Sequence, residues 1–172
     1  MSVQQFKSAL KGGGSRGNRF EVIVNIPGAS NDVINNTRFL VSSTNIPGST
    51  LGTIEQPFRG RVLKLAGDRT FDSWECTFVN DTDFGIREAL ETWSNSINAY
   101  NSNTGTHIPD DYMSEIYVYQ LDGMNNRIKE FKLMLAWPAV VGQIELAQDA
   151  NNQIESFNVT FEYSDIDNGS ST

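Results

Sequence analysis

The side chains best suited to nucleophilic catalysis are scarce in this chain, which contains one histidine, His107, and one cysteine, Cys76. A Ser–His–Asp or Cys–His arrangement would have to use His107 as its base. This histidine lies in a run with almost no apolar residues, 101–111, which is typical of an exposed loop. Cys76 falls on the apolar side of a predicted strand, where a cysteine packs as a small hydrophobic residue. The sequence therefore predicts no catalytic residue.

Four aspartates raise the question of a carboxylate pair or a cation site. Asp81 and Asp83 precede a predicted helix, and Asp110 and Asp111 end the polar loop. Paired carboxylates hydrolyse glycosides, and clustered carboxylates bind divalent cations. Aspartate is also favoured at helix caps and turns, which explains these positions better. Because one cysteine and one histidine cannot complete a structural zinc site either, we expect no metal.

Phosphate binding has no support in the sequence. The glycine run at residues 12–15 lacks the lysine that follows in a phosphate-binding loop, and no strand precedes it. The formal net charge is −8, from 21 acidic and 13 basic side chains, whereas gripping a nucleic-acid backbone needs clustered Lys and Arg. We expect no cofactor and no adhesion to nucleic acid. The same charge suits a surface past which DNA slides, although solubility is the simpler explanation.

The length and the termini indicate a single soluble domain. The 172 residues suit one domain with a sizeable core. The first residues lack the apolar run of a signal peptide, and no stretch approaches the roughly 18 apolar residues of a membrane span. The sequence therefore predicts a cytosolic protein without membrane insertion.

One amphipathic helix is predicted at about residues 83–99. Ile86, Leu90, Trp93 and Ile97 recur there at the spacing of one helical face. Such a stripe must pack against an apolar surface, and the apolar side of the strands just before the helix is the expected partner.

Alternating apolar and polar residues predict about seven strands. In one of them Leu135 points inward and Pro138 ends the strand. Gly67 and Asp68 are predicted to form a type II′ turn that joins two of the strands, and residues 29–36 are predicted to be a loop. The predicted strands span residues 20–26, 38–42, 61–66, 74–78, 112–121, 128–137 and 154–163.

Both ends of the chain are predicted to lie outside the domain. Residues 1–17 form a flexible arm, with a short helix at residues 2–10 and a glycine-rich joint after it. This arm is the one locally basic region, and it is expected either to be loose or to reach a neighbouring subunit. Residues 165–172 are polar and predicted to be a disordered tail.

These elements predict a mainly β fold, a sandwich or barrel of antiparallel sheets with the helix packed on it. Such sheets leave edge strands, which invite pairing unless they are covered or used. A subunit whose two edges meet neighbours head to tail closes into a ring if the rotation per step divides a full turn.

Two blocks of sequence resemble the tail tube proteins of T-even-like contractile-tailed bacteriophages. The first is LKLAGDRTFDSW at residues 63–74, and the second combines a Trp-Pro pair with NNQIESFNVT at residues 151–160. The resemblance covers roughly residues 15–163. The residues that carry this signature are Gly67, Asp68, Arg69, Phe71, Trp74, Trp93, Trp137 and Pro138.

The resemblance implies a single tube-type β domain at residues 18–164. Its sheets would join into a continuous barrel within hexameric rings, and the rings would stack into a conduit for DNA. Sheath protein would surround the tube, the tape measure protein would lie inside it, and baseplate tube proteins would start it. The protein would be assembled in the host cytoplasm and carried in the virion. Polar strand faces are the candidates for the lumen: Glu130 and Lys132, or Ser156, Asn158, Thr160 and Glu162.

Other functions stay open on the sequence. The inner tube of a contractile injection system and a baseplate tube-initiator protein are close variants. A carbohydrate-binding β-sandwich would use exposed Trp74, Trp93 or Trp137 as platforms, and a hydrolase would use paired carboxylates. Each tryptophan lies on the apolar side of its element, so we expect core packing instead.

Overall fold

The computed structural model describes residues 2–10, 12, 14–149 and 151–169. Lys11 and Gly13 of the predicted arm and residues 170–172 of the predicted tail lie outside the described residues. The helices are α1 (Val3–Ala9), α2 (Asn31–Leu40), α3 (Gly85–Ile97) and α4 (Pro109–Tyr112). The strands are β1 (Phe20–Val24), β2 (Val41–Thr44), β3 (Thr50–Phe58), β4 (Arg61–Thr70), β5 (Trp74–Val79), β6 (Ser114–Leu121), β7 (Arg127–Val141), β8 (Ser156–Glu162) and β9 (Asp165–Asp167).

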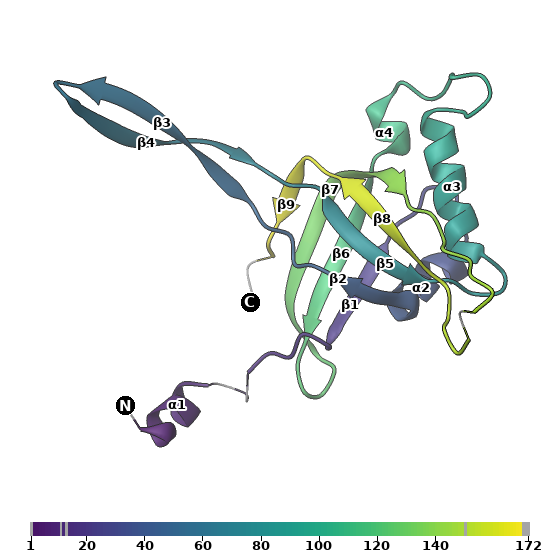
Figure 1. The fold of residues 1–172 in the computed structure, drawn as a ribbon, viewed down its shortest axis with the longest axis horizontal. Coiled ribbons are helices and arrows are strands. Elements are labelled where there is room, and N and C mark those ends of the chain that lie inside the picture. Colours follow the sequence, from purple (N-terminus) through teal and green to yellow (C-terminus); the bar gives the residue numbers. More distant parts are fainter. Residues whose placement is uncertain (1, 11, 13, 150, 170–172) are drawn as a thin grey trace.

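The body is built on one antiparallel sheet, which confirms the predicted mainly β class. Its strand order is β1-β6-β7-β8-β5-β2, with β9 on β7. Strand β7 belongs to both halves of the sheet, because its first part pairs with β6 and its last part with β8. The half with β8, β5 and β2 lies across the half with β6 and β1 (Figure 1). The two halves therefore enclose a core between them.

Helix α3 covers this core with the predicted stripe. Ile86, Leu90 and Trp93 are each at most 3% exposed. The Trp93 ring lies 6.2 Å from the ring of Phe161 on β8, and its Nε1 donates to the carbonyl of Tyr112 at 2.7 Å. The stripe is therefore confirmed. Of the strands just before the helix, β5 shares the core with this stripe as expected, whereas β4 does not belong to the enclosing sheet.

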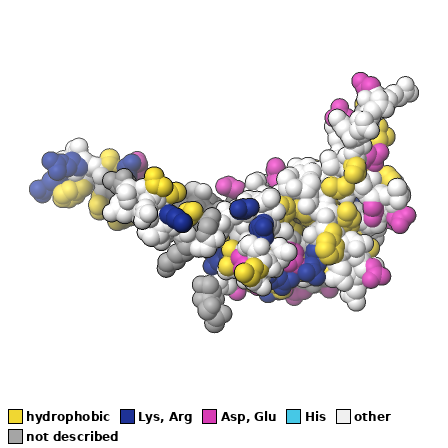
Figure 2. Space-filling view, turned by 90° about the horizontal axis from the view of Figure 1, so that it is seen from below, with side chains coloured by type: hydrophobic (Ala, Val, Ile, Leu, Met, Phe, Trp, Pro, Cys, Tyr) yellow, Lys and Arg dark blue, Asp and Glu magenta, His cyan; other side chains and the backbone are white. Residues whose placement is uncertain are grey.

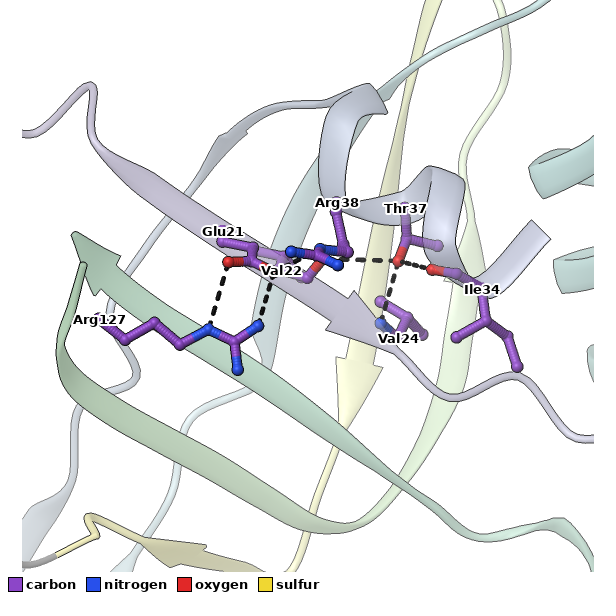
Figure 3. A network of polar contacts seen from close by, with 7 residues as sticks. All are labelled: Glu21, Val22, Val24, Ile34, Thr37, Arg38 and Arg127. Atoms are coloured by element: carbon purple, nitrogen blue, oxygen red, sulfur yellow. Dashed lines mark hydrogen bonds and ion pairs between the residues drawn. The ribbon is translucent and has the colours of Figure 1, made fainter. Parts of the chain in front are cut away.

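A second helix, α2, stands where a loop was predicted at residues 29–36 and a strand was predicted to begin at residue 38; the strand, β2, begins only at Val41. Ser30 caps it, with its hydroxyl accepting from the amide of Val33 at 3.4 Å. The fully buried Thr37 hydroxyl accepts from the amide of Val24 at 3.3 Å and lies 3.5 Å from the carbonyl of Val22 (Figure 3). Backbone groups cut off from water need hydrogen-bond partners. The Thr37 side chain thus supplies a partner for backbone groups of β1 on the edge that pairs with no strand. Helix α2 therefore covers the free edge of β1.

The turn predicted at Gly67 and Asp68 does not exist. Both residues lie within β4, which pairs with β3 and not with β5. The chain turns at Arg59 and Gly60, where both φ angles are positive, +46° and +81°. Glycine adopts this conformation without strain, so the two-residue turn lies eight residues before the predicted one.

Strand β7 departs from the prediction in two ways. It continues past Pro138 to Val141, and its pairing with β8 shifts register between Pro138 and Val140, the kind of irregularity that accommodates proline. Leu135 was predicted to face the core but is 46% exposed. Its φ is +57°, and the pairing with β6 also shifts there. After Leu133, the next side chain that faces the core is therefore that of Ala136 and not that of Leu135, because a bulge inserts one extra residue.

The chain beyond the predicted domain also contains structure. Residues Asp165–Asp167, predicted to begin a disordered tail, form β9 against Lys132, Leu133 and Met134 of β7. Lys129 then donates from Nζ to the carbonyl oxygens of Asn168 and Gly169, at 2.7 and 3.2 Å. The polar composition hid this strand because only Ile166 contributes an apolar side chain to it.

Candidate assembly surface

Strands β3 and β4 form a separate two-stranded ribbon, which we call the hairpin, and it projects far from the body (Figure 1). Cross-strand pairing places Ile54 opposite Leu65, and Leu63 and Phe58 lie on the same side of the ribbon. These four side chains are 48–66% exposed. An isolated two-stranded hairpin is marginally stable in water, and a contiguous exposed apolar patch marks an interaction site. The hairpin therefore has the chemistry of a docking arm.

The opposite side of the hairpin is mixed, with the apolar pair Pro57 and Val62 near the tip and polar residues behind it. Glu55 lies opposite Lys64, and their side chains form an ion pair of 3.5 Å. At the tip, the Arg59 guanidinium stacks over the Phe58 ring at 5.3 Å. Figure 2 shows Lys and Arg side chains in dark blue next to hydrophobic ones in yellow at the far end of this projection. The hairpin thus has an apolar side and a basic tip.

Several signature residues fix the base of the hairpin. Arg69 donates from Nη1 to the hydroxyl of Ser49 at 2.6 Å. The Phe71 ring lies 5.7 Å from that of Tyr163. Trp74 is buried, and its Nε1 donates to the carbonyl of Asn45, in the segment that leads into β3, at 2.7 Å. Of the other signature tryptophans, Trp93 is buried and Trp137 half-buried. The exposed platforms of a sugar-binding module are therefore not formed.

Gly67 has a role that differs from the predicted turn. It faces Gly52 across the hairpin, where the register shifts between Leu51 and Thr53. A Cβ at Gly67 would lie 3.1 Å from the carbonyl carbon of Gly52. The two strands approach so closely here that a side chain would push them apart.

Gly67→Ala is expected to impair assembly while the body stays folded. An added methyl group where Gly67 approaches Gly52 costs about 1 kcal/mol by overpacking. This corresponds to a roughly fivefold increase in the protein concentration at which polymerisation begins. Gly48→Ala is the matched control, because a Cβ there meets nothing within 4 Å. The measurement is sedimentation of polymer against protein concentration. Equal concentrations for both variants would contradict the role assigned to Gly67.

The lumen candidates fall on two different faces. Glu130 and Lys132 lie on β7 beside β6, where Lys132 forms an ion pair of 2.7 Å with Glu115. That contact, together with a hydrogen bond from Tyr117, lowers the pKa of Glu115, and the same carboxylate raises the pKa of Tyr117. The Arg127 guanidinium stacks 3.8 Å from the ring centre of Tyr119 on this face. The face near Glu130 and Lys132 therefore carries ion-paired and ring-stacked cations.

The other four candidates do lie together. Ser156, Asn158, Thr160 and Glu162 are on the outward side of β8, and Asn158 and Thr160 stand opposite Thr77 and Glu75 of β5. Strands β2, β5 and β8 and residues 135–141 of β7 contain no Lys or Arg. This half of the sheet therefore presents a neutral to acidic outer face.

The described residues form no metal site and no nucleophilic site. Among the described residues no group of three His, Cys, Asp or Glu side chains could hold a metal ion. Burial raises the pKa of the Cys76 thiol, which keeps it protonated. His107 is exposed. Asp81 accepts from the amide of Gly85, the first residue of α3, at 3.1 Å, although the N-cap position itself is Phe84. No helix in the described part of the chain is long and apolar enough to span a membrane.

Comparison with known proteins decides the family. A sequence profile described as "Phage tail tube protein" matches residues 15–166. The chain belongs to the phage tail tube protein family. It is 33% identical over 166 residues to the tail tube protein of Serratia phage KSP90, covering 94% of each chain. It is 29% identical over 162 residues to tail tube protein gp19 of Enterobacteria phage T4, covering 93% of this chain and 96% of that one.

Solved structures share the tail tube fold. One is the extended sheath–tube complex of an extracellular contractile injection system, with a TM-score of 0.59, 17% identity and 96% of each chain covered. Another is the tube-terminating cap of the anti-feeding prophage, with a TM-score of 0.60, 15% identity and 89% of each chain covered. The resemblance seen in the sequence is thus confirmed. The protein is a structural tail tube subunit of a contractile phage tail, carried in the virion, and not an enzyme.

Proposed function

We propose that the subunit assembles head to tail into hexameric rings that stack into a hollow tube through which DNA passes. The hairpin is the observation that carries this proposal, because its apolar side requires a partner that its own body does not provide. Its basic tip suits the acidic surface of another copy, whose chain has a net charge of −8. Opposite charges on the two ends of a subunit favour head-to-tail association.

The ring contact is best explained by the sheet half that contains β2. Within the described chain, β2 pairs with β5 on one side and with no strand on the other. The last residues of β7 likewise pair with β8 only. Joining β2 of one copy to the end of β7 in the next would extend one sheet around a cylinder, as a heterologous interface requires. The edge of β1 takes no part, because α2 covers it.

The same sheet half supplies the lumen in this proposal. Ser156, Asn158, Thr160 and Glu162 would face the DNA with Glu75 and Thr77. A surface without Lys or Arg releases no counterions from a phosphate backbone and so does not bind it. Glu130 and Lys132 would lie outside the lumen, on the face where the cations gather.

The remaining partners follow from the arrangement of the subunit in this tube. Helices α2 and α3 would face outward towards the sheath protein, because α3 covers the core side of the sheet whose other side faces the lumen in this proposal. Baseplate tube proteins would start the polymer, the tape measure protein would occupy the lumen, and assembly would take place in the host cytoplasm.

Thr160→Lys tests the lumen. Tubes are expected to form normally, but their inner rings of lysine should retain DNA and slow its release, and the effect should weaken as salt rises. Thr92→Lys, on the exposed side of α3, adds the same charge outside and should leave release unchanged. Electron microscopy and the rate of DNA release are the measurements. Normal release from Thr160→Lys tubes would refute the lumen assignment, and absence of hollow tubes from the unchanged protein would refute the proposed function.

A further inference from the structure

A groove of about 380 Å³ lies where α4, the start of β6, the bulge in β7 and β9 meet. Its lining consists of three apolar side chains, which we call its floor, three carboxylates, which we call its rim, and Ser114, and no Lys or Arg lines it. Of the rim carboxylates, Glu115 is paired with Lys132, whereas Asp110 and Asp165 form no ion pair with any described residue. We call this site the acidic groove. The residues that define it are Met113, Met134 and Leu135 on the floor and Asp110, Glu115 and Asp165 on the rim.

The bulge in β7 is what gives the groove its floor. Leu135 has a φ of +57°, a conformation that costs a leucine free energy because its Cβ crowds the backbone. In return the side chain turns out of the core and lines the groove. Strain of this kind persists where the surrounding structure requires it, and it is concentrated at binding sites. An exposed leucine on a strained bulge therefore points to an apolar ligand.

Helix α1 has the complementary chemistry. Val3 and Phe6 are 84% and 69% exposed, Leu10 follows on the same face, and no residue of α1 is buried in its own subunit. Lys7 lies between the apolar positions in the last turn. Ser2 and Gln5 form a capping box that stabilises the first turn. The helix is thus a small amphipathic element with a basic residue and no partner.

The position of the arm makes the contact intermolecular. The arm leads into Phe20 of β1, which pairs with Gln120 near the end of β6. The groove lies at the other end of β6, where Ser114 pairs with Ala136. In Figure 1 α1 lies at the end of the molecule away from α4. We propose that α1 of one subunit docks into the acidic groove of a neighbouring copy. This inference rests on the proposed head-to-tail assembly and names a second contact within it.

As an occupant of the groove, α1 fits better than the hairpin does. Three side chains of a two-turn helix match a short apolar floor, and Lys7 meets the unpaired Asp110 and Asp165. The hairpin carries a longer apolar side, from Ile54 to Phe58, and needs a larger surface. Because many such contacts act together in a polymer, each needs only modest affinity.

Cross-linking of two full-length variants tests the contact. Phe6→Cys and Leu135→Cys are prepared separately, mixed in equal amounts under tube-forming conditions and treated with a short bis-maleimide. The mixture is expected to give a covalent dimer that neither variant gives alone, which excludes docking within one chain. Native Cys76 does not interfere because it is buried. Lys7→Glu in the Phe6→Cys chain should lower the dimer yield about fivefold, as expected for loss of one surface ion pair.

The controls separate this inference from the proposed function. Phe6→Cys mixed with Ile154→Cys, an apolar site outside the groove that is even more exposed than Leu135, should give no dimer. Tubes without the Phe6–Leu135 dimer would refute the docking of α1 and leave the tube intact. A dimer between Phe58→Cys and Leu135→Cys in its place would assign the groove to the hairpin. A Phe6–Leu135 dimer without tubes would support the docking and refute the polymer.

Discussion

Replacing Ile54, Leu63 and Leu65 with serine is expected to give a folded subunit that no longer forms tubes. These side chains lie on one side of the hairpin and are about half exposed, so the core of the body does not depend on them. Because about half of each side chain remains to be buried, its burial in an assembly is worth about 0.8 kcal/mol or more, and losing three would weaken assembly at least roughly fiftyfold. Analytical ultracentrifugation and electron microscopy measure assembly, and circular dichroism measures the fold.

The polar residues on the opposite side of the hairpin provide the matched control. Thr53→Ser, Glu55→Ser and Lys64→Ser change the same number of residues on the same two strands. This variant should polymerise close to the normal concentration, because an exposed ion pair contributes at most about 1 kcal/mol. Tubes from the apolar triple variant at normal concentration would show that the hairpin is not the assembly arm. Loss of the sheet signal in that variant would show that the hairpin stabilises the body.

The hairpin was also the element least accessible to sequence analysis. Alternation predicted a strand at residues 61–66, which β4 confirms. It could not predict the pairing with β3, because neither face of the hairpin is buried in its own chain. Gly67 and Gly60 are both compatible with a turn, so the local signal was ambiguous. The close approach of Gly67 to Gly52 depends on a register that only the partner strand defines. The signature was therefore recognised correctly, and its buried Trp74 and Trp93 were placed correctly in the core, but the turn assigned to Gly67 and Asp68 was wrong.

The elements that face the core were predictable for the opposite reason. Phe157, Val159 and Phe161 of β8 alternate with polar residues, and all three are buried. The stripe of α3 was equally clear. Both elements bury one face within the same chain, so the pattern of apolar residues reports the fold directly.

The sequence analysis did not predict the elements that depend on polar contacts or on a strained backbone. Ser30 is a signal for the start of helix α2, but the asparagine-rich sequence after it is typical of a loop. The burial of Thr37, whose hydroxyl accepts from the amide of Val24 in β1, was therefore not predicted. The bulge at Leu135 is invisible to a periodic pattern, because every residue from Leu133 to Val141 is apolar and the sequence shows no alternation there. The acidic groove therefore could not be found from the sequence, since its floor depends on that bulge.

Trp74→Ala is expected to lower the free energy of unfolding by about 3–5 kcal/mol, the usual loss when a large aromatic side chain is removed from a core. Trp74 is 2% exposed, and its ring lies 5.7 Å from that of Phe161. Its indole also holds the carbonyl of Asn45 at 2.7 Å, at the entrance to the hairpin. For a chain of this length the loss corresponds to a fall of roughly 6–20 °C in Tm.

Trp74→Phe separates the two roles of this tryptophan. Phenylalanine keeps most of the apolar volume but cannot donate to Asn45, so the expected loss is about 1–2 kcal/mol, the cost of an unsatisfied carbonyl and a small cavity. Both variants are measured by urea unfolding in the hairpin triple-serine background, which keeps the protein monomeric. Tyr100→Ala, at an exposed ring, should change stability by less than about 0.5 kcal/mol. If Trp74→Ala is no less stable than Tyr100→Ala, Trp74 is not part of the core and the anchoring of the hairpin at its base must be reassigned.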